Sequence, residues 1–168
     1  MPINESLLPE LDQELAMTRK TLERVPMDQF DWKPHPKSFS LGELANHLSR
    51  LLWWGAETMK TESLDLAPEG GGIKAPPVVR TTEALLAAFD EGVTGFRGAV
   101  EGAADEDLLF PWTLFRGGQP LFTLPRVVVI RNTILNHIIH HRGQLTVYLR
   151  MNDVPVPALY GPSADERS

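Results

Sequence analysis

The sequence contains no cysteine. This absence excludes disulfide bonds, cysteine nucleophiles and cysteine-based zinc sites. The sequence also lacks an apolar run close to the ~20 residues that a membrane-spanning helix needs. Its first ten residues, MPINESLLPE, lack the basic start and apolar core of a signal peptide. We therefore expect a cytoplasmic protein.

Positive charge is scarce. The chain has 16 Lys and Arg residues against 22 Asp and Glu residues, a formal net charge of −6. Because a nucleic-acid interface needs a basic patch, this balance argues against nucleic acid as a partner. Three site motifs are missing as well: HExxH of metalloproteases, Glu-x-x-His of di-iron bundles, and the Lys-Ser/Thr that would follow glycines 70–72 in a phosphate-binding loop.

The 168 residues are expected to form one domain, 1–168, because the chain is long enough to bury a sizeable core. Apolar residues recur at steps of three and four in four segments, the pattern of helices with one buried face. The first helix is expected over Ser6–Val25, and the second starts at a capping box of Ser40 and Glu43. Thr81 or Thr82 caps the third, and the fourth opens at Thr123 and Pro125 and ends near Asn152.

Residues 63–80 are rich in Pro and Gly and predict a loop. Fully extended, these residues span ~60 Å, about twice the length of a twenty-residue helix, so the loop can cross the bundle and let the second and third helices run parallel. Residues 112–124, with Gly117-Gly118 between two apolar arms, predict a small hairpin. The expected fold class is all-α, a four-helix bundle with a long crossover between helices 2 and 3.

Three histidines stand where this pattern demands apolar residues. His137 and His141 lie one helical turn apart on the inward face of the last helix, and His47 occupies an inward position of the second. Buried imidazoles need partners, and a shared metal ion would satisfy all three. His140 would replace a neighbour if the helix were rotated. His35, in a Pro-rich loop, is expected to be a surface residue.

Neutral imidazoles suit Zn, Ni, Cu and Fe, and three protein ligands leave a position open for water or substrate. Zinc would lower the pKa of a bound water to ~7 or hold a thiol as thiolate. Gln144 is a candidate for orienting a ligand or contacting substrate, and Arg142 for binding an anion at the rim. The alternatives are a buried amide and a solvated surface arginine. Trp54 either walls the pocket or packs in the core.

Three stretches resemble the DinB/YfiT superfamily of bacterial metal-binding bundles: TRKTLERVP, DWKPHPKSFSLGELANHLSRL and HIIHHRGQLTVYLR. The most specific motif is HxxxHRGQ, here His137–Gln144. The resemblance implies an up-down-down-up bundle, a metal ion held by His47, His137 and His141, and a homodimer. Apolar residues outside the core stripe, Leu52 and Trp53, favour a dimer as well. Some members of the superfamily use low-molecular-weight thiols such as bacillithiol or mycothiol.

Two functions are compatible with these residues. The first is a metal-dependent enzyme of the thiol S-transferase or hydrolase type, with Zn or Ni as the favoured ion. An external thiol or water would be the nucleophile, because the chain has no cysteine and no recognisable serine triad. The second is a non-catalytic metal-binding or stress-related interaction protein, in which the ion mainly joins the second and fourth helices.

Overall fold

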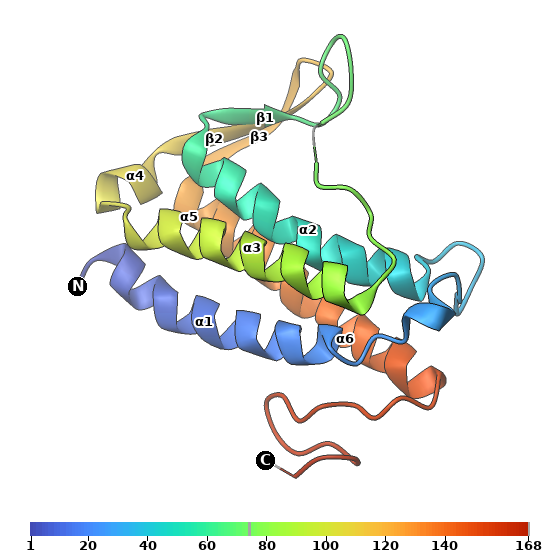
Figure 1. The fold of residues 1–168 in the computed structure, drawn as a ribbon. Helices are drawn as coiled ribbons and strands as arrows, with labels where there is room; N and C mark the ends of the chain where they lie inside the picture. The colour runs from blue at the N-terminus through green and yellow to red at the C-terminus, as the bar shows by residue number, and fades with distance from the viewer. Residues whose placement is uncertain (74, 168) are drawn as a thin grey trace.

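The computed structural model describes residues 1–73 and 75–167. Within them, three long helices are α1 (Ile3–Leu22), α2 (Leu41–Lys60) and α3 (Thr82–Glu101). A fourth continuous helical segment consists of α5 (Arg126–Val129), the π-helical turns η2 (Ile130–Leu135) and α6 (Asn136–Met151). These four segments pack side by side, with α2 and α3 running opposite to α1 and α6 (Figure 1).

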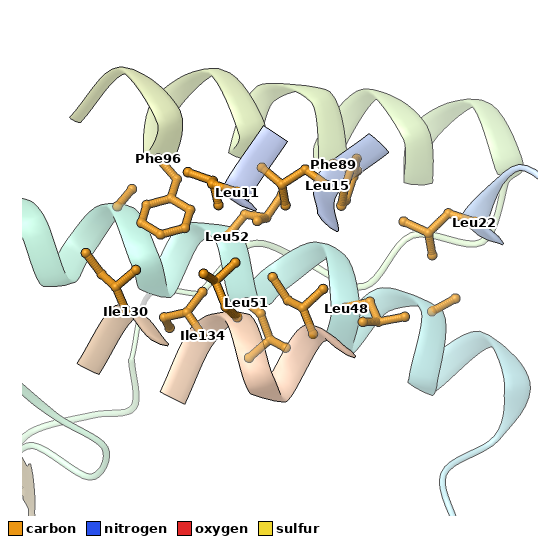
Figure 2. Close-up of a cluster of buried hydrophobic side chains, with 14 of the residues drawn as sticks. Leu11, Leu15, Leu22, Leu48, Leu51, Leu52, Phe89, Phe96, Ile130 and Ile134 are labelled. Atoms are coloured by element: carbon orange, nitrogen blue, oxygen red, sulfur yellow. The ribbon is translucent and has the colours of Figure 1, made fainter. Parts of the chain in front are cut away.

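The core lies between these four segments. Figure 2 shows its side chains meeting from all of them, and each labelled side chain is at most 5% exposed. Burying one such side chain contributes about 1.5–3 kcal/mol, so this apolar interior is the main source of stability. The labelled residues are Leu11, Leu15, Leu22, Leu48, Leu51, Leu52, Phe89, Phe96, Ile130 and Ile134.

Local signals set the helix starts. Ser40 Oγ accepts the backbone N–H of Glu43 at 3.2 Å, and the Glu43 carboxylate accepts the backbone N–H of Ser40 at 2.7 Å. This reciprocal pair confirms the predicted capping box and fixes the start of α2 at Leu41, nearly two turns before His47. Thr81 caps α3 through the backbone N–H of Ala84. The first helix starts and ends three residues earlier than expected, at Ile3 and Leu22.

The prediction of an all-α four-helix bundle was wrong, because the chain also forms a three-stranded mixed sheet. Strand β2 (Pro111–Arg116) pairs antiparallel with β3 (Gln119–Pro125) and parallel with β1 (Ser63–Asp65). The β2–β3 hairpin matches the expected hairpin, since Gly117 and Gly118 take φ of 59° and 75° as a tight two-residue turn requires. Strand β1 lies in the stretch that was read as loop. Its pairing partner is fifty residues away in the sequence, so no local pattern predicts it.

The sheet lies at the C-terminal end of α2, and the residues just before α3 lie near the opposite end of α2 (Figure 1). A short helix, α4 (Asp105–Leu109), and a 3-10 turn, η1 (Met27–Gln29), complete the described elements. The end of the crossover is held against α2 by two hydrogen bonds between the Asn46 amide and the backbone of Val79, at 2.8 and 2.9 Å. No helix in the described residues has both the length and the apolar character required to cross a membrane.

Candidate metal centre

His47, His137 and His141 lie together between α2 and α6. One nitrogen from each ring lies within 4.8 Å of the other two, and the Nε2 atoms of His47 and His137 are 3.3 Å apart. All three side chains are half-buried. We call these three residues the histidine centre.

The outward nitrogens of two of these rings are held by the protein. His137 Nδ1–H donates to the carbonyl oxygen of Thr133 at 3.2 Å, and His141 Nδ1–H donates to Oε1 of Gln144 at 2.7 Å. Since both partners are acceptors, Nδ1 carries the proton in each ring and Nε2 keeps its lone pair. Metal-binding histidines are usually oriented by a hydrogen bond on the second nitrogen in this way.

The π-helical turns of η2 end at Leu135, two residues before His137. Such wide turns within α-helices occur frequently at functional sites. Here the turn contains Thr133, whose carbonyl oxygen accepts the His137 ring N–H. The π-helical segment therefore contains the carbonyl oxygen that orients the His137 ring.

The surroundings keep the three imidazoles neutral near pH 7. Burial, the neighbouring His141 and His137, and Arg50 lower the pKa of His47 to about 4. Burial is also the largest cause of the lowered pKa of His137 and of His141; the Thr133 and Gln144 hydrogen bonds oppose it in part. Neutral imidazole is the form that donates a lone pair to a metal ion.

The donor set fits a transition metal. Three neutral nitrogen donors converge, and no carboxylate belongs to the group that the described residues form. Such a set suits Zn, Ni, Cu or Fe, whereas Mg and Ca prefer oxygen ligands. Because two rings already have a partner on Nδ1, they can bind an ion through Nε2 without giving up that hydrogen bond.

The other two histidines lie outside this group. His140 is exposed; its ring centroid is 4.9 Å from that of His141 but it adds no atom to the centre. His35 is exposed in the loop before α2, where its Nδ1 accepts the backbone N–H of Lys37. The placement of both agrees with the choice of His47, His137 and His141 as candidate ligands.

The two candidate catalytic residues have different positions. Gln144 is exposed and contacts His141 directly, so its amide orients a candidate ligand. Arg142 does not lie at the rim: its side chain is 1% exposed and pairs with Glu14 at 2.5 Å. Arg142 also donates to the Glu14 carbonyl oxygen and to the hydroxyls of Thr18 and Tyr160. We call these four residues the Arg142 network.

Sequence reasoning missed the Arg142 network because it considered Arg142 only as an anion-binding residue at the rim or as a solvated surface arginine. A signal was present, since Leu7, Leu11, Glu14 and Thr18 follow steps of three and four along a face that is buried in the structure. A charged residue in such a series indicates a buried partner. The partner, Arg142, is 128 residues away.

Two pockets open on the histidine centre, and they share no lining residue. The His47 pocket, about 220 Å³, is mainly apolar and lies between α2, β1 and the start of the crossover; Trp54 forms part of its wall. The His141 pocket, about 260 Å³, is more polar and is lined by Lys37, Ser38, Phe39, His141, Gln144 and Tyr148. A small molecule therefore has two routes to the histidines, of different chemical character.

A sequence model of the DinB superfamily matches residues 10–145, most of the chain and all three histidines. The chain belongs to the DinB superfamily. The chain is also similar to the uncharacterized protein YrdA of Bacillus subtilis (strain 168), with 24% identity over 153 residues, which are 91% of this chain and 85% of YrdA.

Two solved structures share the DinB fold. A DinB-like protein from Bacillus cereus ATCC 10987 is 24% identical with a TM-score of 0.69, over 95% of this chain and 98% of its own. The DinB-like protein YjoA from Bacillus subtilis is 18% identical with a TM-score of 0.66, over 90% and 96% of the two chains. At these identities the two structures support the fold.

Proposed function

We propose that this protein binds one divalent transition metal ion, zinc or nickel, through His47, His137 and His141, and that it is a metal-dependent enzyme of the thiol S-transferase or hydrolase type. The observation that carries the proposal is the convergence of three imidazole nitrogens within 4.8 Å, with the far nitrogen of two rings already hydrogen-bonded. Three ligands from the protein leave at least one position open, which is typical of catalytic sites.

A bound ion would supply Lewis acidity, favouring the ionised form of a water or thiol near neutral pH. The chain itself contributes orientation and access. The Thr133 carbonyl and the Gln144 amide fix two of the rings. The His141 pocket gives a polar nucleophile a way in, and Lys37 in its lining attracts an anionic or acidic one.

An external nucleophile is part of the proposal. The sequence has no cysteine, so a thiol reaction needs a thiol that is not part of the chain. Bacillithiol, mycothiol, glutathione and coenzyme A are the thiols to test first.

The test combines metal analysis with turnover. Purified protein is assayed with each thiol and the electrophile monochlorobimane, and with ester substrates for the hydrolase branch, before and after chelator treatment. We expect turnover that is lost with the metal and restored when zinc or nickel is added back. Turnover that survives complete metal removal would contradict the mechanism.

A second candidate is a non-catalytic metal-binding protein. His47 lies on α2 and the other two histidines lie on α6. An ion bound by all three would therefore join two helices, which favours a stabilising role for the metal. A large loss of stability on chelation, without turnover in any assay, would favour this candidate.

We also propose a homodimer. The structure removes part of the sequence-based argument for it, because one of the two residues expected on the surface is buried. Leu52 is fully buried, and a Cβ added at Gly92 would lie 2.8 Å from its Cβ, so Leu52 offers no surface to a second copy. Exposed apolar surface on α6 does remain, at Val147 and Met151, which are 57% and 55% exposed. Light scattering that detects only monomer at micromolar protein would contradict a dimer.

A further inference from the structure

The His47 pocket combines an apolar lining with one charged side chain, and neither metal binding nor the packing of the fold requires this combination. Apolar side chains line most of it, from α2, from β1 and the residues after it, and from the crossover: Leu51, Trp53, Trp54, Leu64, Leu66 and Ile73. Arg50 is the one charged residue in its described lining. Small-molecule sites are typically lined by apolar side chains with a few polar groups that orient the ligand, and this cleft beside the candidate metal centre has that composition.

Arg50 is placed to bind an anion. It lies three residues after His47 on α2 and is half-buried. Within residues 1–73 and 75–167 no hydrogen bond or ion pair involves its side chain, although Glu91 lines the adjoining groove. Every other arginine that is half-buried or buried in those residues has a hydrogen-bond partner: Arg19, Arg24, Arg97, Arg126 and Arg142.

A second polar group in the wall also lacks a partner. The indole N–H of Trp54 is buried, and no acceptor for it exists among the described residues. This nitrogen has less than 1 Å² of accessible surface, so it does not face the open volume of the pocket. The choice of ligand atom therefore rests with Arg50, whose guanidinium only donates hydrogen bonds and favours an anionic oxygen.

The volume limits the apolar part of the ligand. An apolar cavity of about 150 Å³ holds one benzene molecule. The His47 pocket measures about 220 Å³, so it has room for one ring or branched chain with a short substituent. Arg50 and Trp53 also line a groove of about 410 Å³ between α2 and α3. The anionic end of the ligand therefore lies where pocket and groove meet.

We propose that the His47 pocket is the substrate site and that it takes a small organic anion, an apolar ring or branched chain carrying one carboxylate, which Arg50 binds. Its role as the substrate site rests on the proposed function; the binding itself does not require the metal. In this arrangement the substrate enters beside His47, and the nucleophile enters through the His141 pocket.

The test uses three probes: phenylacetate, its neutral analogue phenylacetamide, and acetate, which lacks the ring. Calorimetric titration at pH 7 is performed on the protein as purified and after chelator treatment, so that binding of a carboxylate to a metal ion is separated from binding to Arg50. We expect phenylacetate to bind about tenfold or more tightly than either other probe in both preparations.

Variants assign this preference to residues. Arg50→Gln should weaken phenylacetate about tenfold and leave phenylacetamide unchanged, whereas Leu66→Gln should weaken both ring-containing probes. Arg116→Gln is the matched control, because Arg116 is an exposed arginine on β2 outside the pocket lining; it should change neither affinity.

Equal affinity for phenylacetate and phenylacetamide would overturn the proposal, as would an Arg50→Gln variant that loses less than about twofold, or no binding of any probe. These failures would leave metal content unchanged. Conversely, a protein that binds no metal but keeps the Arg50-dependent preference would contradict the proposed function and support the anion site.

Discussion

Two adjacent residues of α6, His141 and Arg142, belong to polar clusters of opposite character. In the Arg142 network, the buried guanidinium meets the Glu14 carboxylate at 2.5 Å, and the Tyr160 hydroxyl donates to the same carboxylate at 2.8 Å. In the histidine centre, three neutral rings turn nitrogen atoms toward one another. The first cluster contains donors, acceptors and both signs of charge. The second contains only neutral imidazole rings.

This difference assigns the Arg142 network to the stability of the fold and supports the proposal that the histidine centre binds a metal ion. The Arg142 network is complete without anything added, and it joins α6 to α1 and to the C-terminal tail. The histidine centre brings together three ring nitrogens whose one mutual hydrogen-bond contact joins Nε2 of His47 and Nε2 of His137 at 3.3 Å, so a bound metal ion would satisfy all three nitrogens at once. The predictions below test this contrast, from the largest expected effect to the smallest.

Removing the acid of the Arg142 network should destabilise the protein without affecting metal. Glu14→Ala leaves the Arg142 charge buried and unpaired, which costs about 3–5 kcal/mol of unfolding free energy. Glu10→Ala is the control, because Glu10 pairs with Arg131 on the surface and such pairs contribute at most about 1 kcal/mol. Urea unfolding measures both. A loss below about 1 kcal/mol in Glu14→Ala would contradict a structural role for the network.

Removing the metal should destabilise the protein only where the histidine centre is intact. A ligand at a hundred times its Kd stabilises the folded state by about 2.7 kcal/mol, which corresponds to a rise in Tm of about 5–10 °C for a chain of this size. Melting with zinc and with chelator should show this difference in the wild type and none in His137→Ala. An equal difference in both proteins would place the ion elsewhere.

Removing the Gln144 amide, which orients the His141 ring, should weaken metal binding but not abolish it. Gln144→Ala releases the His141 ring, and losing such an orienting group typically lowers metal affinity about 10–100-fold. Competition with a chelating dye measures the affinity for zinc. Gln13→Ala, an exposed glutamine on α1, is the matched control. If both variants keep wild-type affinity, the His141–Gln144 hydrogen bond has no role in metal binding.

The metal-free protein should gain stability as pH rises from about 4 to about 6.5. The pKa of His47 is about 4 in the folded chain and about 6.5 when unfolded. Between these values the unfolded chain binds a proton that the folded chain does not, so lowering the pH favours unfolding. Below about pH 4 this contribution is lost completely. His47→Gln should show a smaller slope in chelator-containing urea titrations, and identical slopes would contradict the lowered pKa.

The sequence predicted features that depend on neighbouring residues. Helical spacing and the Ser40–Glu43 capping box located α2, and the same spacing marked His47, His137 and His141 as inward-facing residues, which the structure brings together. The Gly117-Gly118 pair predicted the hairpin for an equally local reason, the positive φ of its turn.

Features that depend on distant partners were missed. Strand β1 has three residues, too few to show a period, and exists because β2 pairs with it. Arg142 was assigned to the surface because its acid lies 128 residues away on another helix. The all-α fold class failed because the expected hairpin was not counted toward a sheet, and because β1, which pairs with it across fifty residues, leaves no local pattern.

The central claim, one metal ion held by His47, His137 and His141, is tested most directly by elemental analysis of purified protein after dialysis against zinc or nickel. The account predicts about one ion per chain in the wild type and in the controls His35→Ala and His140→Ala. It predicts almost none in His137→Ala, because two remaining imidazoles make a poor site. Full occupancy in His137→Ala would contradict it.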